Sequence, residues 1–396
     1  MTVVKDQATN RRGFLGQIST AAAALAGGLG SLFGATGARL EAAEDERSDR
    51  SEREIDAYTI RHEAAIFQRN LPSPSHATNG DDRRYWTFIA SYSKGLPHNG
   101  LGEVDAAAYD LLQDALETGE PDDFALVPLG GVAKLSDPQA ALAFQMDGAD
   151  SHHLGIRVPP GFSSAEEAGE MAEVYWQALT RDVPFADYDV DPDIAAAAAS
   201  LSLFSDFRGP KSGGHVTPAT LFRGGTTGDT TGPYISQFLW KPVPYGPYSI
   251  TQKVKPGVAG ADYMSDVGTW LNIQNGGVAA PFVLDPTPRY INNNRALAAY
   301  VHADFSYQAY LNAALMLLAT PGSLATSNPY RTSLNQAGFA TFGGPEIVDV
   351  VAHVAVLALK AAWYQKWSVH RRLRPEAFAG PRSASVSACL PPFEQL

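Results

Sequence analysis

Cationic side chains crowd one segment near the C-terminal end, Lys360 to Gly380 (KAAWYQKWSVHRRLRPEAFAG). If the segment is helical, Lys366, His370 and Arg374 lie at i, i+4 and i+8, so their side chains can converge on one point. A lysine point charge beside an arginine fork suits a tetrahedral or trigonal oxyanion. The alternative is a solvated cationic helix end that complements the helix dipole. Spacing alone leaves both interpretations open.

A long helix is needed to position these cations. Gly344 is a suitable cap, and Glu346 complements the positive end of the helix dipole. From Ile347 to Ala362 the sequence is apolar on almost every side, which predicts a central helix that is buried all round. Pro375 disfavours helical geometry at Arg374, so we expect the helix to end there.

The motif KWSVHRRLRPEAFAG resembles the first active-site motif of the vanadium-dependent haloperoxidases, in particular the algal and bacterial bromoperoxidases. Their anion pocket is shared with a superfamily of acid phosphatases. Four other blocks resemble segments of the same enzymes in the same order: SKGLPHNGLGEVD, AEVYWQALTRDVPFADY, GPYISQFLWKPVPYG and HADFSYQAYLNAALML. The resemblance therefore covers residues 55–380.

The resemblance implies a function and a cofactor. Vanadate would be held with Lys366 and Arg374 on its equatorial oxygens, and Lys366 would also polarise the bound peroxide. Hydrogen peroxide and halide would be the substrates, the metal would act as a Lewis acid, and the product would be a hypohalous acid equivalent. No family role transfers to His370.

Two later motifs of the family have no counterpart here. One is a Ser-Gly-His group, and the other is an arginine followed by the histidine that coordinates vanadium. Ser212 to His215 (SGGH) has one glycine too many and precedes Lys366, so we interpret it as a loop. We therefore expect no vanadium-coordinating histidine in this chain, a helical bundle that is incomplete at its C-terminus, and a disordered tail over residues 381–396.

Three functional hypotheses follow. The first is a vanadium haloperoxidase by descent that is impaired as this chain, with weak anion binding and negligible turnover. The second is an acid phosphatase of the same superfamily. The third is a non-catalytic remnant or interaction protein. The blocks outside the cationic motif favour the haloperoxidase branch over the phosphatase branch.

The overall charge limits the partners. The formal net charge of the 396 residues is −12 at pH 7. An acidic surface of this kind argues against nucleic acid and anionic membranes as partners. The single cysteine, Cys389, excludes an intramolecular disulfide and a cysteine-based metal site.

The N-terminal residues read as an export signal. Arg11 and Arg12 precede a weakly hydrophobic run rich in alanine and glycine, which resembles a twin-arginine signal over residues 1–43. Residues 44–54 read as a charged, solvated linker. We expect a periplasmic or extracellular protein with no stable membrane span after signal removal.

Helical patterns dominate the remaining chain, which predicts an all-α helical bundle with long irregular loops. Helices are expected at residues 105–118, 164–180 and 292–318, and in the alanine run after Asp193. Asp81 to Arg84 (DDRR) reads as a self-neutralised surface. Apolar faces left uncovered by an incomplete bundle would favour homo-oligomerisation.

Overall fold

The computed structural model describes residues 52–72, 74–320, 322, 324–378 and 380. The predicted signal over residues 1–43, most of the predicted linker and the predicted tail over 381–396 lie outside these residues. The chain divides into two compact units. The first comprises residues 1–73 with 322–346, and its main described element is α3 (Glu52–Asn70). This helix begins within the expected linker and contains no buried residue.

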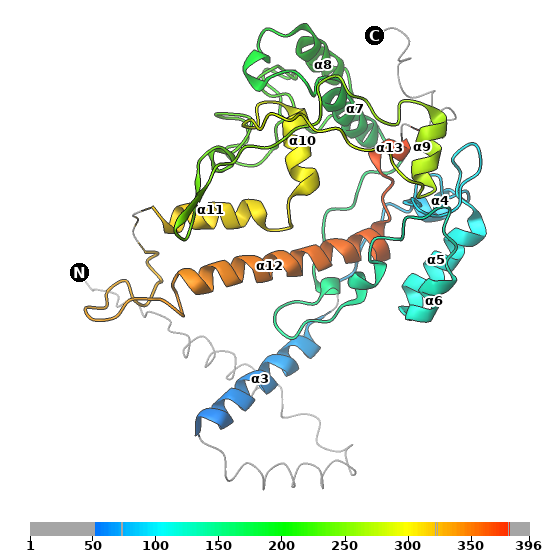
Figure 1. Ribbon diagram of the computed structural model, residues 1–396. Helices are drawn as coiled ribbons and strands as arrows, with labels where there is room; N and C mark the ends of the chain where they lie inside the picture. The colour runs from blue at the N-terminus through cyan, green and yellow to red at the C-terminus, as the bar shows by residue number, and fades with distance from the viewer. Residues whose placement is uncertain (1–51, 73, 321, 323, 379, 381–396) are drawn as a thin grey trace, which may run out of the picture. The chain divides into compact units, whose positions relative to one another are not determined.

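The second unit comprises residues 74–321 and 347–396 and is called the helical unit here. Its helices (Figure 1) are α4 (Asp81–Arg84), α5 (Ala106–Thr118), α6 (Pro121–Leu126), α7 (Ala165–Leu179), α8 (Pro192–Ser202), α9 (Val267–Gln274), α10 (Asn294–Ala303), α11 (Gln308–Leu318), α12 (Gly344–Tyr364, of which residues 344–346 are assigned to the first unit) and α13 (Pro375–Phe378). Short 3₁₀ turns are η3 (Pro138–Leu142), η4 (Ser151–His153), η5 (Phe185–Asp187) and η6 (Gln237–Leu239). An antiparallel pair, β1 (Val243–Tyr245) and β2 (Tyr248–Ile250), adds little strand, so the predicted all-α class is confirmed.

Three of the predicted helices form because the sequence supplies their caps. The Asp105 side chain accepts a hydrogen bond from the Ala108 amide at the start of α5. Ser164 does the same for α7, and Asp191 for α8. Each cap satisfies an amide that a helix start would otherwise leave without a partner.

The helix predicted over residues 292–318 is in fact two helices. Asn293 caps α10, which ends at Ala303, and Asp304 has extended backbone geometry before α11 begins at Gln308. The two helices pack on different partners. Ala296 of α10 is buried with Ile235 and Ile291, whereas α11 packs on β1 and η6.

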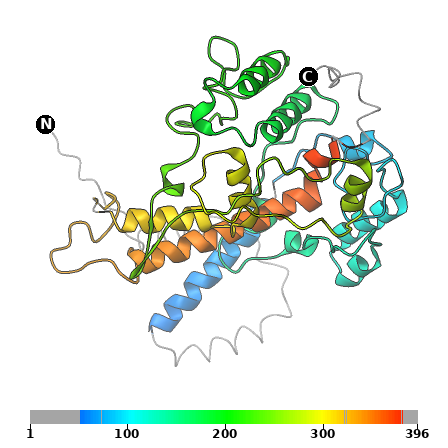
Figure 2. The same ribbon diagram turned by 45° about the horizontal axis from the view of Figure 1, so that its top comes forward.

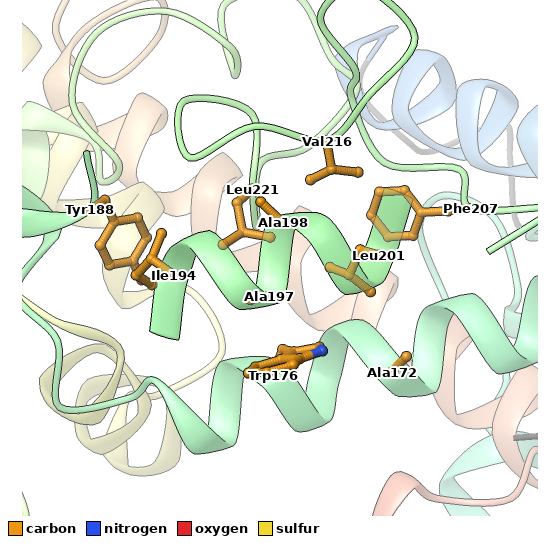
Figure 3. Close-up of a cluster of buried hydrophobic side chains, with 10 residues drawn as sticks. All are labelled: Ala172, Trp176, Tyr188, Ile194, Ala197, Ala198, Leu201, Phe207, Val216 and Leu221. Atoms are coloured by element: carbon orange, nitrogen blue, oxygen red, sulfur yellow. The ribbon is translucent and has the colours of Figure 1, made fainter. Parts of the chain in front are cut away.

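One compact core lies between α7 and α8 (Figure 3). It contains ten buried side chains: Ala172, Trp176, Tyr188, Ile194, Ala197, Ala198, Leu201, Phe207, Val216 and Leu221. In the close-up, Trp176 projects from α7 toward α8, and the chain after α8 closes the opposite side. This packing fixes α7, whose other face supports the cationic segment described below.

The prediction that α12 is buried all round is wrong for this chain. Ala361 is its only buried residue, and Val350 and Val354 are 49% and 56% exposed. Its apolar composition therefore reflects a surface that the described residues leave uncovered. The helical residues 344–370 are long and apolar enough to cross a membrane. The core helix of a soluble protein can meet the same criterion, so this is weak evidence for a membrane span.

Candidate anion-binding site

The cationic segment departs from α-helical geometry just where its charges begin. After Tyr364, residues Gln365–His370 form a π-helix, η7, in which the Arg371 amide donates to the Lys366 carbonyl at 3.0 Å. Arg371 then adopts a left-handed conformation with φ of 41°, which ends the helix. The prediction of a helix reaching Arg374 is therefore wrong, and Pro375 starts α13 instead of stopping α12.

Trp367 explains why the helix widens at this point. Its side chain is fully buried in a cluster with Leu96, Tyr109 and Leu112, so it packs η7 against α5. Figure 2 shows that α12, coloured orange, ends beside the cyan helices that include α5. A π-turn shifts the side-chain directions relative to an α-helix, which allows the tryptophan to point inward while Lys366 faces a pocket.

Two of the arginines are neutralised by carboxylates from distant parts of the chain. Arg371 forms an ion pair with Asp82, and both side chains are mostly buried. Arg372 bridges Glu167 and Glu170 of α7 at 2.7 and 2.5 Å. The prediction that residues 81–84 neutralise one another on the surface is therefore wrong, because Asp82 forms its ion pair with Arg371 of the cationic segment.

Lys366 and Arg374 both line one pocket. The pocket has a volume of about 410 Å³. Its wall is made by the cationic segment, by α7 and by the loop before α5: Tyr92, Glu170, Met171, Val174, Lys366, Arg372, Leu373, Arg374 and Pro375. The two cations reach it from η7 and from the extended residues after Arg371, and not from one helical face.

Lys366 lies in a cage of aromatic rings. Its Nζ is 4.7 Å from the ring centre of Tyr92, 4.7 Å from Trp367 and 5.1 Å from Trp363. Burial, together with the positive charges of Arg374 and Lys94, lowers the pKa of Lys366. Within the described residues no carboxylate pairs with this ammonium, so its charge is available to an anionic ligand.

Lys94 and Glu376 belong to the same site but were not selected from the sequence. Glu376 Oε1 lies 2.5 Å from Arg374 Nε and 3.0 Å from Lys94 Nζ. Burial raises the pKa of Glu376, but Arg374 and Lys94 outweigh it and hold that pKa below its usual value. Their positions in the sequence gave only an indirect indication of this role. Lys94 lies in the block SKGLPHNGLGEVD, and Glu376 lies in the cationic motif itself.

His370 does not join Lys366 and Arg374. Both of its ring nitrogens are buried and have no hydrogen-bond partner within the described residues. Burial, followed by the electrostatic effects of His76 and Arg371, lowers the pKa of His370. This histidine does not line the anion pocket.

Comparison with known proteins finds bromoperoxidases that resemble this chain over most of its length. The chain is 35% identical over 353 residues to a vanadium-dependent bromoperoxidase of Ascophyllum nodosum, covering 85% of this chain and 62% of the relative. A vanadium-dependent bromoperoxidase of Corallina pilulifera is 29% identical over 412 residues, covering 85% and 68%. The chain is homologous to the vanadium-dependent bromoperoxidases. No family model matches it.

A solved structure agrees with the sequence relatives. The homohexameric second vanadate-dependent bromoperoxidase of A. nodosum superimposes with a TM-score of 0.78 at 33% identity. The match covers 86% of this chain and 58% of that chain. The present chain thus spans about three-fifths of the length of these bromoperoxidases, and it has their helical fold over that part.

The residues present fit an oxyanion such as the vanadate of bromoperoxidases. Of the three cations that line the pocket, Arg372 is paired with Glu167 and Glu170, and Arg374 shares Glu376 with Lys94. Lys366 has no carboxylate partner in the described chain. Ammonium and guanidinium groups donate strong hydrogen bonds to anionic oxygens. Among the described residues no histidine lines the pocket, so this part supplies oxygen-binding cations and no metal-coordinating nitrogen.

Glu173 of α7 should give the stability of the helical unit a pH dependence. Burial and the neighbouring Glu170 raise the pKa of Glu173 to about 7, whereas an unfolded glutamate titrates near 4.5. Since the folded pKa is the higher one, stability falls as pH rises from about 4.5 through 7. Glu173→Gln should raise unfolding free energy by about 1–2 kcal/mol at pH 8, and the gain should shrink toward pH 4.

Urea unfolding at both pH values would measure this difference. Glu117→Gln, at an exposed position of α5, is the matched control and should show no comparable gain. An equal effect of both substitutions would show that overall charge, and not burial of Glu173, sets the pH dependence.

Proposed function

We propose that this chain carries the vanadate-binding cations of a vanadium-dependent haloperoxidase, an enzyme that oxidises halide with hydrogen peroxide to a hypohalous acid equivalent. The observation that supports it is the convergence of Lys366 and Arg374 on one pocket in a chain homologous to bromoperoxidases. The same relatives favour this reaction over the phosphate hydrolysis of the wider superfamily.

Arg374 and Lys366 would have different roles toward the bound oxyanion. Arg374, oriented by Glu376, would donate to an oxygen of the bound oxyanion with its remaining N–H groups. Lys366 would donate to the oxygen that reacts, and its aromatic neighbours would limit access of water to the ammonium. When bound, vanadate supplies a Lewis-acid centre that makes peroxide reactive toward halide.

Vanadate-dependent bromination of a phenolic dye tests this proposal. The purified full chain is assayed with peroxide and bromide, with and without orthovanadate, beside the A. nodosum relative. We expect activity that depends on vanadate and is far below that of the relative, because the described pocket contributes cations but no histidine. Loss of any vanadate effect in a folded sample would contradict the proposal, and hydrolysis of a phosphomonoester would favour the phosphatase.

Export and assembly are part of the proposal. The paired Arg11 and Arg12 before an alanine-rich run support delivery to the periplasm or outside the cell by a twin-arginine pathway. The exposed apolar surface of α12 and the homohexameric state of the solved relative support homo-oligomerisation.

A further inference from the structure

A second group of chemically competent side chains lies at the turn η4, apart from the anion pocket. The potential ligand atoms of Asp150, His152 and His153 all lie within 4.8 Å of one another, and the three side chains are partly buried. The two imidazole rings are 4.1 Å apart between centres. None of the three residues lines the pocket that contains Lys366.

The backbone of this turn is held in place. The amide of Gln145 donates to Asp150 Oδ1 at 2.7 Å, and the amide of His153 donates to the Asp150 carbonyl at 3.0 Å. Ser151, which is 3% exposed, donates its hydroxyl to the Ala141 carbonyl at 2.7 Å. These contacts present the carboxylate and both rings on the same short turn, so little ordering remains for a ligand to impose.

A further histidine ties the turn to the segment that carries Lys366. His76 Nε2 donates to the carbonyl of His152 at 2.9 Å, and Gln365 donates to His76 Nδ1 at 3.2 Å. Gln365 also donates to the Leu154 carbonyl at 2.9 Å. Both nitrogens of His76 are therefore engaged, which excludes it as a ligand and makes it a support for the turn.

The donor set selects one class of ion. Two imidazoles and one carboxylate suit zinc and similar transition metals, whereas calcium and magnesium prefer oxygen ligands alone. Ligands of a tetrahedral zinc ion lie about 3.3 Å apart, as follows from bonds of about 2.0–2.1 Å. The present spacing of up to 4.8 Å is wider, so the side chains must rotate to close around an ion.

We propose that Asp150, His152 and His153 form a binding site for a zinc-type divalent cation at the turn η4. Because the supporting hydrogen bonds run through His76 and Gln365, the bound ion would stiffen the base of the segment that carries Lys366. The site is separate from the vanadate pocket and uses none of its residues.

Competition for Zn²⁺ between the metal-stripped full chain and a chromophoric chelator tests the site. The wild-type chain should bind one zinc per chain and gain thermal stability from it, since only the folded state presents the three ligands together. His152→Gln and His153→Gln should each weaken binding at least tenfold. His215→Gln, at an exposed loop position, should leave the affinity unchanged.

Three outcomes would overturn the proposal. They are the absence of stoichiometric zinc binding, an equal loss in the His215→Gln control, and full binding by the double variant His152→Gln/His153→Gln. Circular dichroism of each variant separates loss of ligands from loss of fold. Because the assay contains no vanadate, its failure would leave the proposed peroxidase function untouched, and failure of bromination would leave this site untouched.

Discussion

Lys366→Ala should weaken vanadate binding by about 10- to 100-fold. The estimate follows from the value of a hydrogen bond to a charged group, about 1.5–3 kcal/mol. Lys366 is the pocket cation without a carboxylate partner among the described residues, whereas Arg374 and Lys94 share Glu376. Line broadening of the ⁵¹V nuclear magnetic resonance signal, titrated with protein at low salt, would measure the loss.

The control for this prediction removes the same charge elsewhere. Lys134→Ala, at an exposed position, should bind vanadate as the wild type does. Because the pKa of Lys366 is lowered, wild-type affinity should also decline at a pH below the ordinary lysine value of 10.5. Equal affinity of the Lys366 and Lys134 variants would remove Lys366 from the site.

Asp82→Ala should destabilise the helical unit by about 3–5 kcal/mol, because it leaves the charge of Arg371 mostly buried and uncompensated. The side chains of Asp82 and Arg371 are only 22% and 15% exposed. Asp82 also accepts a hydrogen bond from Ser91, which is lost at the same time. The midpoint of urea unfolding should fall accordingly, and the loosened segment should bind vanadate more weakly.

A double variant makes this prediction specific to the ion pair. Asp82→Ala/Arg371→Met removes both charges and should recover much of the lost stability, since an apolar pair carries no desolvation cost. Asp110→Ala, at an exposed position of α5, should have little effect. If the double variant is less stable than Asp82→Ala alone, the contribution of the charge pair has been misjudged.

Local signals in the sequence predicted much of this structure. The caps Asp105 and Ser164 mark the starts of α5 and α7 because a capping residue acts on amides only two or three positions away. The nearness of Lys366 and Arg374 was expected because both lie in one motif, although the single helical face expected to carry them does not form. Such features depend on neighbours along the chain, which a single sequence displays directly.

Features that depend on distant residues were not predictable in the same way. The π-turn at η7 allows Trp367 to reach a cluster that contains Leu96 and Tyr109. The amino-acid pattern of η7 itself does not indicate that turn. Lys94 joins Glu376 across 282 positions of sequence. The exposure of α12 was missed because hydropathy reports what a surface prefers and not whether this chain covers it.

The anion pocket straddles two separate hydrophobic cores, and this has a thermodynamic consequence. Trp367, next to Lys366, belongs to the core on α5, whereas Leu373, next to Arg374, belongs to the core with Phe162 and Met171. An oxyanion held by both cations would therefore link the opening of one core to that of the other. Ligand binding would appear as increased cooperativity, with hydrogen exchange slowing together in two regions that otherwise open independently.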